Sequence, residues 1–382
     1  MHIISQVPLY AARRCVRKLY VVTGILLAAQ ADAGLVFTNF DGPPPNDDGL
    51  SISGVNNHGV VIGAVFDADF NKRGFVGVPP GPFDEFALPV GDGHVFLQTQ
   101  LGGINDADVA VAYTPTNPGV PGNPLLLFAQ GSFTTLPALP DDFGGTSARG
   151  INNAGTIAGS FNDLVQFKPR GYVRDADGTY TRFDATPTTE FTSVSGINNN
   201  GVIVGSYSIL HAFTAGFLRA ADGTIKLLDT PAQIGGIAVS NISYGAINDQ
   251  GVSVGSFVDA ANNFYGFIRD ASGTFALVQA PANPLESALV GINDAGLLVG
   301  IWIDPQTGAA HGFLARPEGN GDLNCDGTVN FADINPFVLA LSNPTGYAQQ
   351  YPDCNVLNGD INGDGRVDFG DINPFVGLLS GR

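Results

Sequence analysis

Short apolar runs alternate with turns rich in glycine, asparagine and aspartate along most of the chain, from residue 35 to residue 316. The runs, such as Val202-Ile-Val-Gly205, show no helical period of 3.6 residues. Apolar runs of this kind between turn residues are typical of β-strands. The pattern therefore predicts that residues 35–316 are all-β.

One turn phrase recurs six times, and the Val or Ile within it is separated from the next copy by 49, 47, 46, 50 and 45 residues. A period of this length indicates a repeat architecture in which each unit is one supersecondary structure. The six copies are Gly54-Val-Asn-Asn-His-Gly59, Gly103-Ile-Asn-Asp-Ala-Asp108, Gly150-Ile-Asn-Asn-Ala-Gly155, Gly196-Ile-Asn-Asn-Asn-Gly201, Ala246-Ile-Asn-Asp-Gln-Gly251 and Gly291-Ile-Asn-Asp-Ala-Gly296.

Each unit is interpreted as four strands joined by tight turns. The Asn-Asn/Asp-x-Gly step tolerates the positive φ of hairpin turns, and a second turn such as Ala221-Asp-Gly223 precedes the last strand. Four strands in about 47 residues correspond to one propeller blade. The third strand carries a second landmark, which reads Gly74-Phe75, Leu127-Phe128 in the irregular second unit, Gly171-Tyr172, Gly216-Phe217, Gly266-Phe267 and Gly312-Phe313.

The ends of the array favour a closed ring. The sixth unit stops after Gly312-Phe-Leu-Ala-Arg316 without a fourth strand, and Leu35-Val-Phe-Thr-Asn-Phe-Asp41 resembles that strand. A strand donated from the N-terminal side would remove an exposed sheet edge. Residues 34–316 are therefore predicted to form a six-bladed β-propeller closed by this strand, with an open β-solenoid or a sandwich as alternatives.

The repeated phrase also resembles a known family. Together with His211-Ala-Phe213 and His311-Gly-Phe313 ahead of a strand, the Gly-Ile-Asn-Asn-x-Gly steps are similar to the bacterial extracellular HAF repeat over residues 35–316. Of the six units, those with His211 and His311 match the histidine position of that family. The resemblance implies an exported repeat protein and no particular activity.

Composition narrows the class of protein. Charged residues make up 14% of the chain, which excludes a coiled coil, and hydrophobic residues make up 44%, which excludes a disordered polymer. The formal net charge of −18 would make a nucleic acid or an anionic bilayer repel the chain. No nucleic-acid partner is expected.

Residues 1–33 have the order of a secretory signal peptide. Four basic residues precede an apolar stretch of about eleven residues and an Ala31-Asp-Ala33 step. That stretch is shorter than the roughly 20 residues of a membrane span, and no later segment supplies one. Cleavage near Gly34 and a secreted or cell-surface protein are predicted; the alternative is an uncleaved membrane anchor.

A different duplicated unit follows a predicted linker at residues 317–321. Segments 320–342 and 358–380 match at 16 of 23 positions. Each contains oxygen-bearing residues at alternate places around a glycine, the pattern of a Ca²⁺ loop. The predicted ligands of two Ca²⁺ sites are Asp322, Asn324, Asp326, Thr328, Asn330 and Asp333, and Asp360, Asn362, Asp364, Arg366, Asp368 and Asp371, where Thr328 and Arg366 contribute backbone carbonyls. The alternative is a pair of Asp-rich turns without metal.

This tandem, residues 322–382, resembles a type I dockerin. Asp333 and Asp371 stand where an EF-hand has Glu, and no full helix precedes either loop. The phrase Asp-Ile-Asn-Pro-Phe-Val after each loop is similar to dockerin-type tails on secreted proteins of planctomycete bacteria. The resemblance implies a small helical calcium-binding domain that docks to a cohesin-like receptor, in systems that degrade polysaccharides. Phe331-Ala332 and Phe369-Gly370 depart from the small hydroxyl residues of cellulosomal dockerins.

Cys325 and Cys354 form an even pair in this tail, once Cys15 leaves with the signal peptide. Such a pair in an exported chain predicts a disulfide, which would stabilise a small domain by about 3.6 kcal/mol in the chain-entropy model. Two free thiols are the alternative.

No catalytic group can be named from the sequence. The four glutamates, Glu85, Glu190, Glu286 and Glu318, lie outside recurring motifs, and the histidines lack metal-ligand spacing. Gly251-Val-Ser-Val-Gly255 matches a nucleophile elbow in letters but aligns with a strand. The Asn/Asp pairs of the repeats are expected to form turns rather than a binding ring, and His211 and His311 to be packing or capping residues.

Two functions stay open at this point. The first is a non-catalytic exported propeller that binds a glycan or protein partner and docks through its calcium module. The alternative is a secreted glycoside hydrolase or polysaccharide lyase with its site at the propeller mouth. A cluster of carboxylates and aromatic residues at one end of the ring, including Trp302, would favour the enzyme.

Overall fold

The computed structural model describes most of the chain outside the predicted signal segment. The described residues are 35–44, 49–66, 72–87, 100–113, 125–137, 139, 146–163, 165–166, 168–208, 214–283, 285–317, 321–325, 329–352, 354–361 and 366–379. The predicted signal peptide, residues 1–33, lies outside them. The boundaries of the linker and of the C-terminal domain stay predictions.

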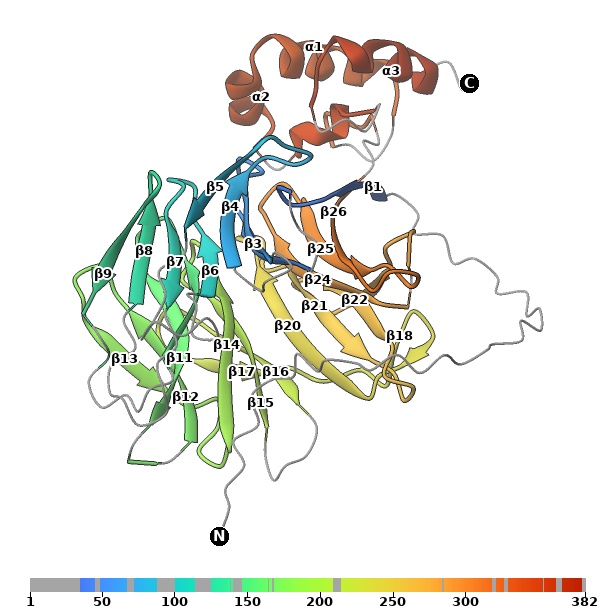
Figure 1. Cartoon of the computed structure of the whole chain (residues 1–382). Coiled ribbons are helices and arrows are strands. Elements are labelled where there is room, and N and C mark those ends of the chain that lie inside the picture. Colours follow the sequence, from blue (N-terminus) through green and yellow to red (C-terminus); the bar gives the residue numbers. More distant parts are fainter. Residues whose placement is uncertain are drawn as a thin grey trace. The chain divides into compact units, whose positions relative to one another are not determined.

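Six four-stranded antiparallel sheets form the blades of a propeller (Figure 1). In blades 1 to 5 the first strand in sequence is innermost, and the later strands follow outward. The bounds are β2 (Gly49–Val55), β3 (Val61–Phe66), β4 (Lys72–Gly77) and β5 (Phe83–Ala87) for blade 1; β6 (Gln100–Ile104), β7 (Ala110–Tyr113), β8 (Leu125–Ala129) and β9 (Ser132–Leu136) for blade 2; β10 (Ser147–Ile151), β11 (Ile157–Asp163), β12 (Lys168–Arg174) and β13 (Tyr180–Phe183) for blade 3.

The second half of the ring repeats the pattern. A two-stranded hairpin, β18 (Gln233–Ile234) and β19 (Ile237–Ala238), stands between blades 4 and 5 in the sequence. The bounds are β14 (Phe191–Ile197), β15 (Ile203–Ser208), β16 (Ala215–Arg219) and β17 (Ile225–Leu227) for blade 4; β20 (Asn241–Ile247), β21 (Ser253–Val258), β22 (Phe264–Arg269) and β23 (Phe275–Val278) for blade 5; β24 (Ser287–Ile292), β25 (Leu298–Ile303), β26 (Ala310–Pro317) and β1 (Leu35–Phe40) for blade 6.

The N-terminal strand closes the ring as predicted. β1 pairs antiparallel with β26 over its whole length, from Leu35 opposite Pro317 to Phe40 opposite Gly312, and supplies the fourth strand of blade 6 (Figure 1). A closed ring leaves each blade with a neighbour on both sides, so the sixth blade gains the outer strand that its own repeat lacks. The open solenoid and the sandwich are therefore wrong.

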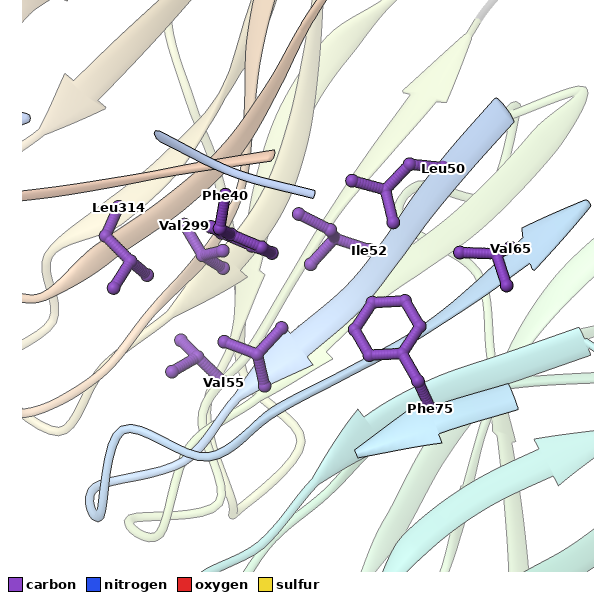
Figure 2. Packing of buried hydrophobic residues seen from close by; sticks show 9 residues of the cluster. Phe40, Leu50, Ile52, Val55, Val65, Phe75, Val299 and Leu314 are labelled. Atoms are coloured by element: carbon purple, nitrogen blue, oxygen red, sulfur yellow. The ribbon is translucent and has the colours of Figure 1, made fainter. Parts of the chain in front are cut away.

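Hydrophobic cores lie between neighbouring blades. Each of six buried clusters combines residues of two adjacent blades, and together they cover all six junctions. Figure 2 shows the junction of blades 6 and 1, where Phe40 packs among Val299, Ile52 and neighbouring aliphatic side chains. The outer strand β1 thus contributes a buried ring as well as backbone pairing.

The second blade shows where the predicted landmark is wrong. Ala112 pairs with Leu126, whereas its counterpart Gly205 in blade 4 pairs with Phe217, so the structural equivalent of the Gly-Phe step is Leu125-Leu126 and not Leu127-Phe128. A Cβ at Gly205 would meet the ring of Phe217. Leucine replaces the aromatic ring in blade 2, and alanine is accommodated opposite it.

The C-terminal region is helical, as predicted. It contains α1 (Ile334–Ser342), α2 (Pro344–Gln350) and α3 (Ile372–Leu379), with 3₁₀ turns at Phe331–Asp333, Val356–Gly359 and Phe369–Asp371. Its small core consists of Leu323, Phe337, Ala340, Tyr347 and Phe375, and the rings of Phe337 and Phe375 stack at 4.2 Å. The duplicated sequence therefore forms a pair of equivalent turn-helix units.

Phe40→Ala tests the closing strand. Because Phe40 is 4% exposed and fills the junction of blades 6 and 1, its truncation should lower the free energy of unfolding by about 3 kcal/mol. Asn39→Ala, which changes an exposed residue of the same strand, should leave stability within about 0.5 kcal/mol. Urea unfolding measures both; equal stability of the two variants would contradict the closing role of β1.

Candidate functional site

A channel runs along the propeller axis between the innermost strands of the six blades. It contains three successive cavities, of about 360 Å³, 70 Å³ and 70 Å³. The two small cavities share a ring of one valine and five isoleucines, which separates the wide end of the channel from the narrow end. The ring consists of Val55, Ile104, Ile151, Ile197, Ile247 and Ile292.

Small residues before this ring allow the blades to approach the axis closely. A Cβ added to Gly103 would lie 3.2 Å from the Cα of Gly150 in the next blade. Backbones at this separation leave no room for larger side chains, which accounts for the glycine that opens the repeated phrase in five of its six copies.

The first asparagine of each repeated phrase joins its blade to the next. In every blade the Nδ2 amide donates to the backbone carbonyl of the equivalent asparagine, at 2.8 to 3.2 Å, and the sixth link returns to the first blade. All six side chains are at least 93% buried. The amide ring is Asn56 to Asn105, Asn105 to Asn152, Asn152 to Asn198, Asn198 to Asn248, Asn248 to Asn293 and Asn293 to Asn56.

The same six side chains also hold their own turns. Asn152 Oδ1, for example, accepts from the backbone N–H groups of Ala154 and Thr156 at 3.1 and 3.0 Å. Aspartate could accept these bonds but has no amide to donate to the next blade. The prediction that these residues form turns is confirmed, but the reading of them as turn formers alone was incomplete. The signal for their second role was an asparagine at this position in all six copies.

The residue after each of these asparagines forms a second ring at the narrow end. Its Oδ1 accepts a backbone N–H from the preceding blade at 2.7 to 2.9 Å, and this set of bonds also closes. Unlike the amide ring, the second ring mixes two residue types. It consists of Asn57, Asp106, Asn153, Asn199, Asp249 and Asp294.

One junction of the second ring brings two carboxylates together. Asp106 Oδ2 accepts from the side-chain amides of Asn57 and Asn153 at 3.0 and 2.6 Å. Asp294 Oδ2 accepts from the side-chain amide of Asn57 at 2.6 Å. Its other neighbour in the ring is Asp249, which has no side-chain amide and donates only its backbone N–H, to Asp294 Oδ1. The ring therefore has a single Asp–Asp junction.

The two arrangements shift the carboxyl pKa values in opposite directions. Burial and the nearby charge of Asp249 raise the pKa of Asp294 above its ordinary value of 3.8. At Asp106 burial acts in the same sense, but hydrogen bonds from Asn153 and Asn57 outweigh it and lower the pKa. The Asp–Asp junction is thus a point of electrostatic strain in the ring.

The wide cavity is lined by the innermost strands of all six blades and is neutral except for one arginine. Of its lining residues, all of which the structure describes, none is a carboxylate or a histidine. Five serines supply the other polar side chains, whereas the ring of Tyr244 is buried in the core between blades 4 and 5. Such a pocket can bind polar ligands, but these side chains offer no pair of groups for acid-base chemistry. The lining is Ile52, Ser53, Leu101, Gly102, Arg149, Ser193, Val194, Ser195, Ser243, Tyr244, Gly245, Ser256, Ala288, Leu289 and Val290.

The two described histidines, His58 and His311, and the single tryptophan line none of the three cavities. His311 Nδ1 is 2.6 Å from Asp41 Oδ1, and its ring stacks on Trp302 at 4.5 Å. Trp302 is partly buried and does not line the wide cavity. His94, His211 and Glu318 lie outside the described residues. The tryptophan and the pocket are therefore separate features.

The remaining catalytic candidates are in structural positions. Ser253 of the Gly-x-Ser-x-Gly sequence is buried within strand β21, with no helix after it, so the match to a nucleophile elbow is a coincidence, as expected. Glu85 forms an ion pair with Arg73 on blade 1. Neither Ser253 nor Glu85 forms a hydrogen bond or ion pair with a histidine among the described residues.

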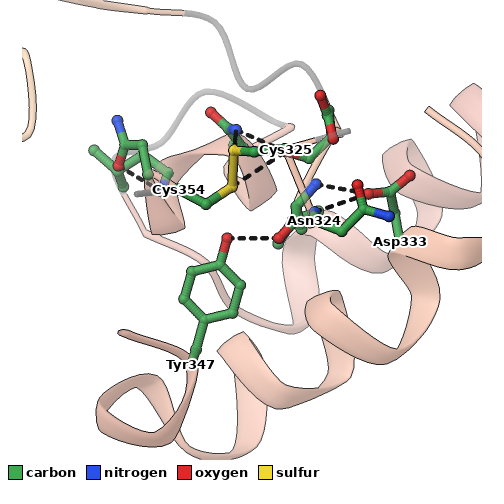
Figure 3. Close-up of a disulfide and its surroundings, with 10 residues drawn as sticks. Asn324, Cys325, Asp333, Tyr347 and Cys354 are labelled. Carbon is green, nitrogen blue, oxygen red and sulfur yellow. Dashed lines mark hydrogen bonds between the residues drawn. A yellow bond between two sulfur atoms is a disulfide. The ribbon is translucent and has the colours of Figure 1, made fainter. Parts of the chain in front are cut away.

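The structure places about two thirds of the predicted calcium ligands. Asp333 is fully buried, and its Oδ1 accepts from the N–H groups of Leu323 and Asn324 at 2.8 and 3.0 Å, while its Oδ2 accepts from that of Asn330 at 2.9 Å (Figure 3). In the second loop, Asp371 Oδ2 accepts from the N–H of Asp368 at 2.9 Å. The aspartates Asp333 and Asp371 therefore stabilise their loops through bonds to backbone N–H groups of the same loop.

The other predicted ligands are partly accounted for. Asp322 and Arg366 lie within the described residues, and Asp360, 1% exposed, forms an ion pair with Arg316 at 3.1 Å. Asp326, Thr328, Asn362 and Asp364 lie outside them. Across the residues that are described, no three His, Cys, Asp or Glu side chains meet closely enough to hold a metal ion. The two calcium sites stay predictions.

The predicted disulfide is confirmed. Cys325 and Cys354, which are 29 positions apart in the sequence, are joined at an S–S distance of 2.07 Å (Figure 3). Beside it, the hydroxyl of Tyr347 donates to the carbonyl of Leu323 at 2.9 Å, and burial raises the pKa of this phenol to about 12. The two free thiols are excluded.

No helix within the described part of the chain is both long and apolar enough to cross a membrane.

Comparison with known proteins shows distant structural likeness. No family model and no curated protein matches the chain. Similar solved structures include a streptogramin B lyase (15% identity, 76% of this chain and 100% of that chain, TM-score 0.41), a protein of unknown function from Dyadobacter fermentans (11%, 75% and 100%, 0.47) and the SapL1 lectin in complex with α-methyl fucoside (10%, 66% and 88%, 0.47). At these values the likeness carries no argument about chemistry, and the propeller assignment rests on the strand pairing.

Asp294→Asn should stabilise the protein at pH 7. The substitution removes the Asp–Asp junction and gives Asp249 an amide donor, as Asn153 gives Asp106, so we expect a gain of about 1 kcal/mol. The matched change Asp106→Asn removes an acceptor of two amides and should destabilise by a similar amount.

Both differences should shrink in acid. A raised folded-state pKa means that Asp294 costs stability only once the pH exceeds the unfolded value of 3.8, whereas the stabilisation from Asp106 begins to fall below pH 3.8 and is fully lost only below its lowered folded-state pKa. Urea unfolding of both variants at pH 7 and near pH 3 measures this. Destabilisation by Asp294→Asn at pH 7 would show that the junction is not strained.

Proposed function

We propose that the chain is an exported, non-catalytic propeller that binds a glycan in its wide axial cavity and docks to a receptor through a calcium-stabilised C-terminal module. The observation that carries the first part is the cavity itself. Its volume, about 360 Å³, falls in the range of small-molecule sites, and its polar lining consists mainly of hydroxyl groups from several blades.

The hydroxyl groups of this cavity are available to a ligand. The hydroxyls of Ser53, Ser193, Ser195 and Ser243 have no hydrogen-bond partner among the described residues, and none of the four residues is buried. Hydroxyls can both donate and accept, which suits the alternating donors and acceptors of a sugar. The lining offers no carboxylate pair of the kind that glycoside hydrolysis uses, so binding is favoured over hydrolysis.

The duplicated tail supports a docking role. On each unit an aromatic residue and a valine seven residues later are exposed, Phe331 by 77% and Val338 by 52%, and Phe369 by 84% and Val376 by 55%. Exposed apolar side chains that recur at equivalent places on both units support a protein-interaction surface there. A cohesin-like receptor is the partner that the dockerin resemblance suggests, and the HAF resemblance and the disulfide agree with an extracellular location.

Calcium fits the donors that the two loops offer. The side chains are Asp and Asn only, which supply the hard oxygen ligands that Ca²⁺ prefers. Among the described residues, Asp322, Asn324, Asn330 and Asp333 would hold the ion in the first loop, and Asp360, Asp368, Asp371 and the carbonyl of Arg366 in the second. Bound Ca²⁺ would neutralise the carboxylates of each loop and so stabilise the fold around the small core.

A glycan panel tests the binding function with the full chain. The wild type should bind at least one glycan, and Ser195→Trp, which fills the cavity, should reduce that binding at least tenfold. Thr181→Trp on the exposed outer strand β13 is the matched control and should bind normally. Cleavage of a bound glycan would contradict the non-catalytic assignment, and absence of binding to any glycan would contradict the proposal.

Calorimetry of the full chain tests the calcium site. The transition of the tail should move to higher temperature with Ca²⁺ than with chelator, and Asp322→Ala, which disrupts the first of the two sites, should reduce that difference. Asp360→Ala is less informative because it also leaves the buried Arg316 without its ion pair. Identical unfolding of the wild type in Ca²⁺ and in chelator would show that the loops do not bind the ion.

A further inference from the structure

The channel face of the innermost strands varies from blade to blade at one level. The residue just before the Gly or Ala of each phrase falls where the pairing of the inner strand is irregular, as between Ala148 and Gly150, and it lines the wide cavity in all six blades. The residue one place earlier, such as Val194 at 1% exposed, packs into the core between two blades. Around the ring this level reads Ser53, Gly102, Arg149, Ser195, Gly245 and Val290.

Arg149 is the single charged side chain at this level, and it borders both the wide cavity and the small cavity below it. Its side chain is exposed, and its nearest aromatic contact is the ring of Tyr113, 5.7 Å from the guanidinium carbon. Among the described residues no carboxylate or other acceptor lies within hydrogen-bonding distance of the guanidinium.

Other arginines of the propeller are engaged. Arg170 bridges Asp163 and Asp184, at 2.9 and 3.1 Å, and Arg219 donates to the carbonyl of Ala220 at 3.2 Å. In a chain with a formal net charge of −18, an arginine that borders a cavity and has no anionic partner within the described part of the chain stands apart from this pattern.

The axis is electrically polarised. Arg149 borders the wide cavity, while the three aspartates of the second ring line the narrow-end cavity, beyond the valine and isoleucine ring. An anion entering the wide end meets a cation and hydroxyls, and the apolar ring separates it from the carboxylates. A guanidinium binds a carboxylate or a sulfate through two parallel hydrogen bonds.

We infer that the wide cavity takes an acidic sugar residue, with the oxyanion of the sugar on Arg149 and its ring hydroxyls on Ser53, Ser193, Ser195 and Ser243. This inference rests on the proposed glycan-binding function and names its ligand class. A uronate and a sulfated sugar share this chemistry, since both carry an oxyanion on a polyhydroxylated ring.

Titration calorimetry with the full chain distinguishes the ligands. The probes are digalacturonate, galactose 6-sulfate, galactobiose and inorganic sulfate, each at 50 mM and 500 mM NaCl. At least one acidic sugar should bind tenfold or more tightly than galactobiose, and the higher salt should weaken it. The stronger of the two acidic probes identifies the oxyanion.

Three variants tie the preference to the guanidinium. Arg149→Gln should lower the affinity for the acidic sugar at least tenfold and leave that for galactobiose unchanged, and Arg149→Lys should fall between it and the wild type. Arg182→Gln on β13, outside the cavity lining, is the matched control and should bind like the wild type.

The outcomes separate the two proposals. Equal affinity for neutral and acidic sugars, or unchanged acidic binding in Arg149→Gln, would overturn the inference and leave glycan binding intact. Binding of inorganic sulfate without any sugar would also overturn it. Absence of binding to all sugars here and to the whole glycan panel would instead overturn the proposed function.

Discussion

The closed ring of asparagine amides is the interaction on which the propeller depends. Each of these side chains accepts from its own turn and donates to the backbone of the next blade, so one residue fixes both the hairpin and its neighbour. Because the sixth link returns from Asn293 to Asn56, the bonds form a cycle rather than a row. Burial makes each bond costly to leave unmade, which opposes opening of the ring at any single junction.

Ring closure also determines where chemistry can vary. The glycine, the apolar residue and the asparagine of each phrase are needed for close approach, for the channel constriction and for the amide ring. The residue before the glycine has none of these roles, and at this position the six repeats range from Gly102 to Arg149. Blades that share one topology and one turn phrase therefore surround an asymmetric pocket, and the ligand preference that we propose arises from the differences among repeats.

The C-terminal tandem is stabilised in a different way from the propeller. Its core is small, and the buried aspartates Asp333 and Asp371 accept hydrogen bonds from backbone N–H groups of their loops. The Cys325–Cys354 bond adds a covalent constraint to the first loop. The small core and the exposed phenylalanines are the features on which our proposal of a calcium-stabilised docking module rests.

The sequence by itself determined the local and repeated features: the strand periods, the six units, the turn at each Asn-Asn/Asp step and the matching of Leu35–Phe40 to the missing sixth-blade strand. These depend on alternation and turn chemistry over a few residues. Tertiary structure decided the Leu125-Leu126 register, the amide links across 45 to 50 residues and the place of Arg149 at the axis. Those features depend on how closely six blades approach one another, a distance that no single repeat contains.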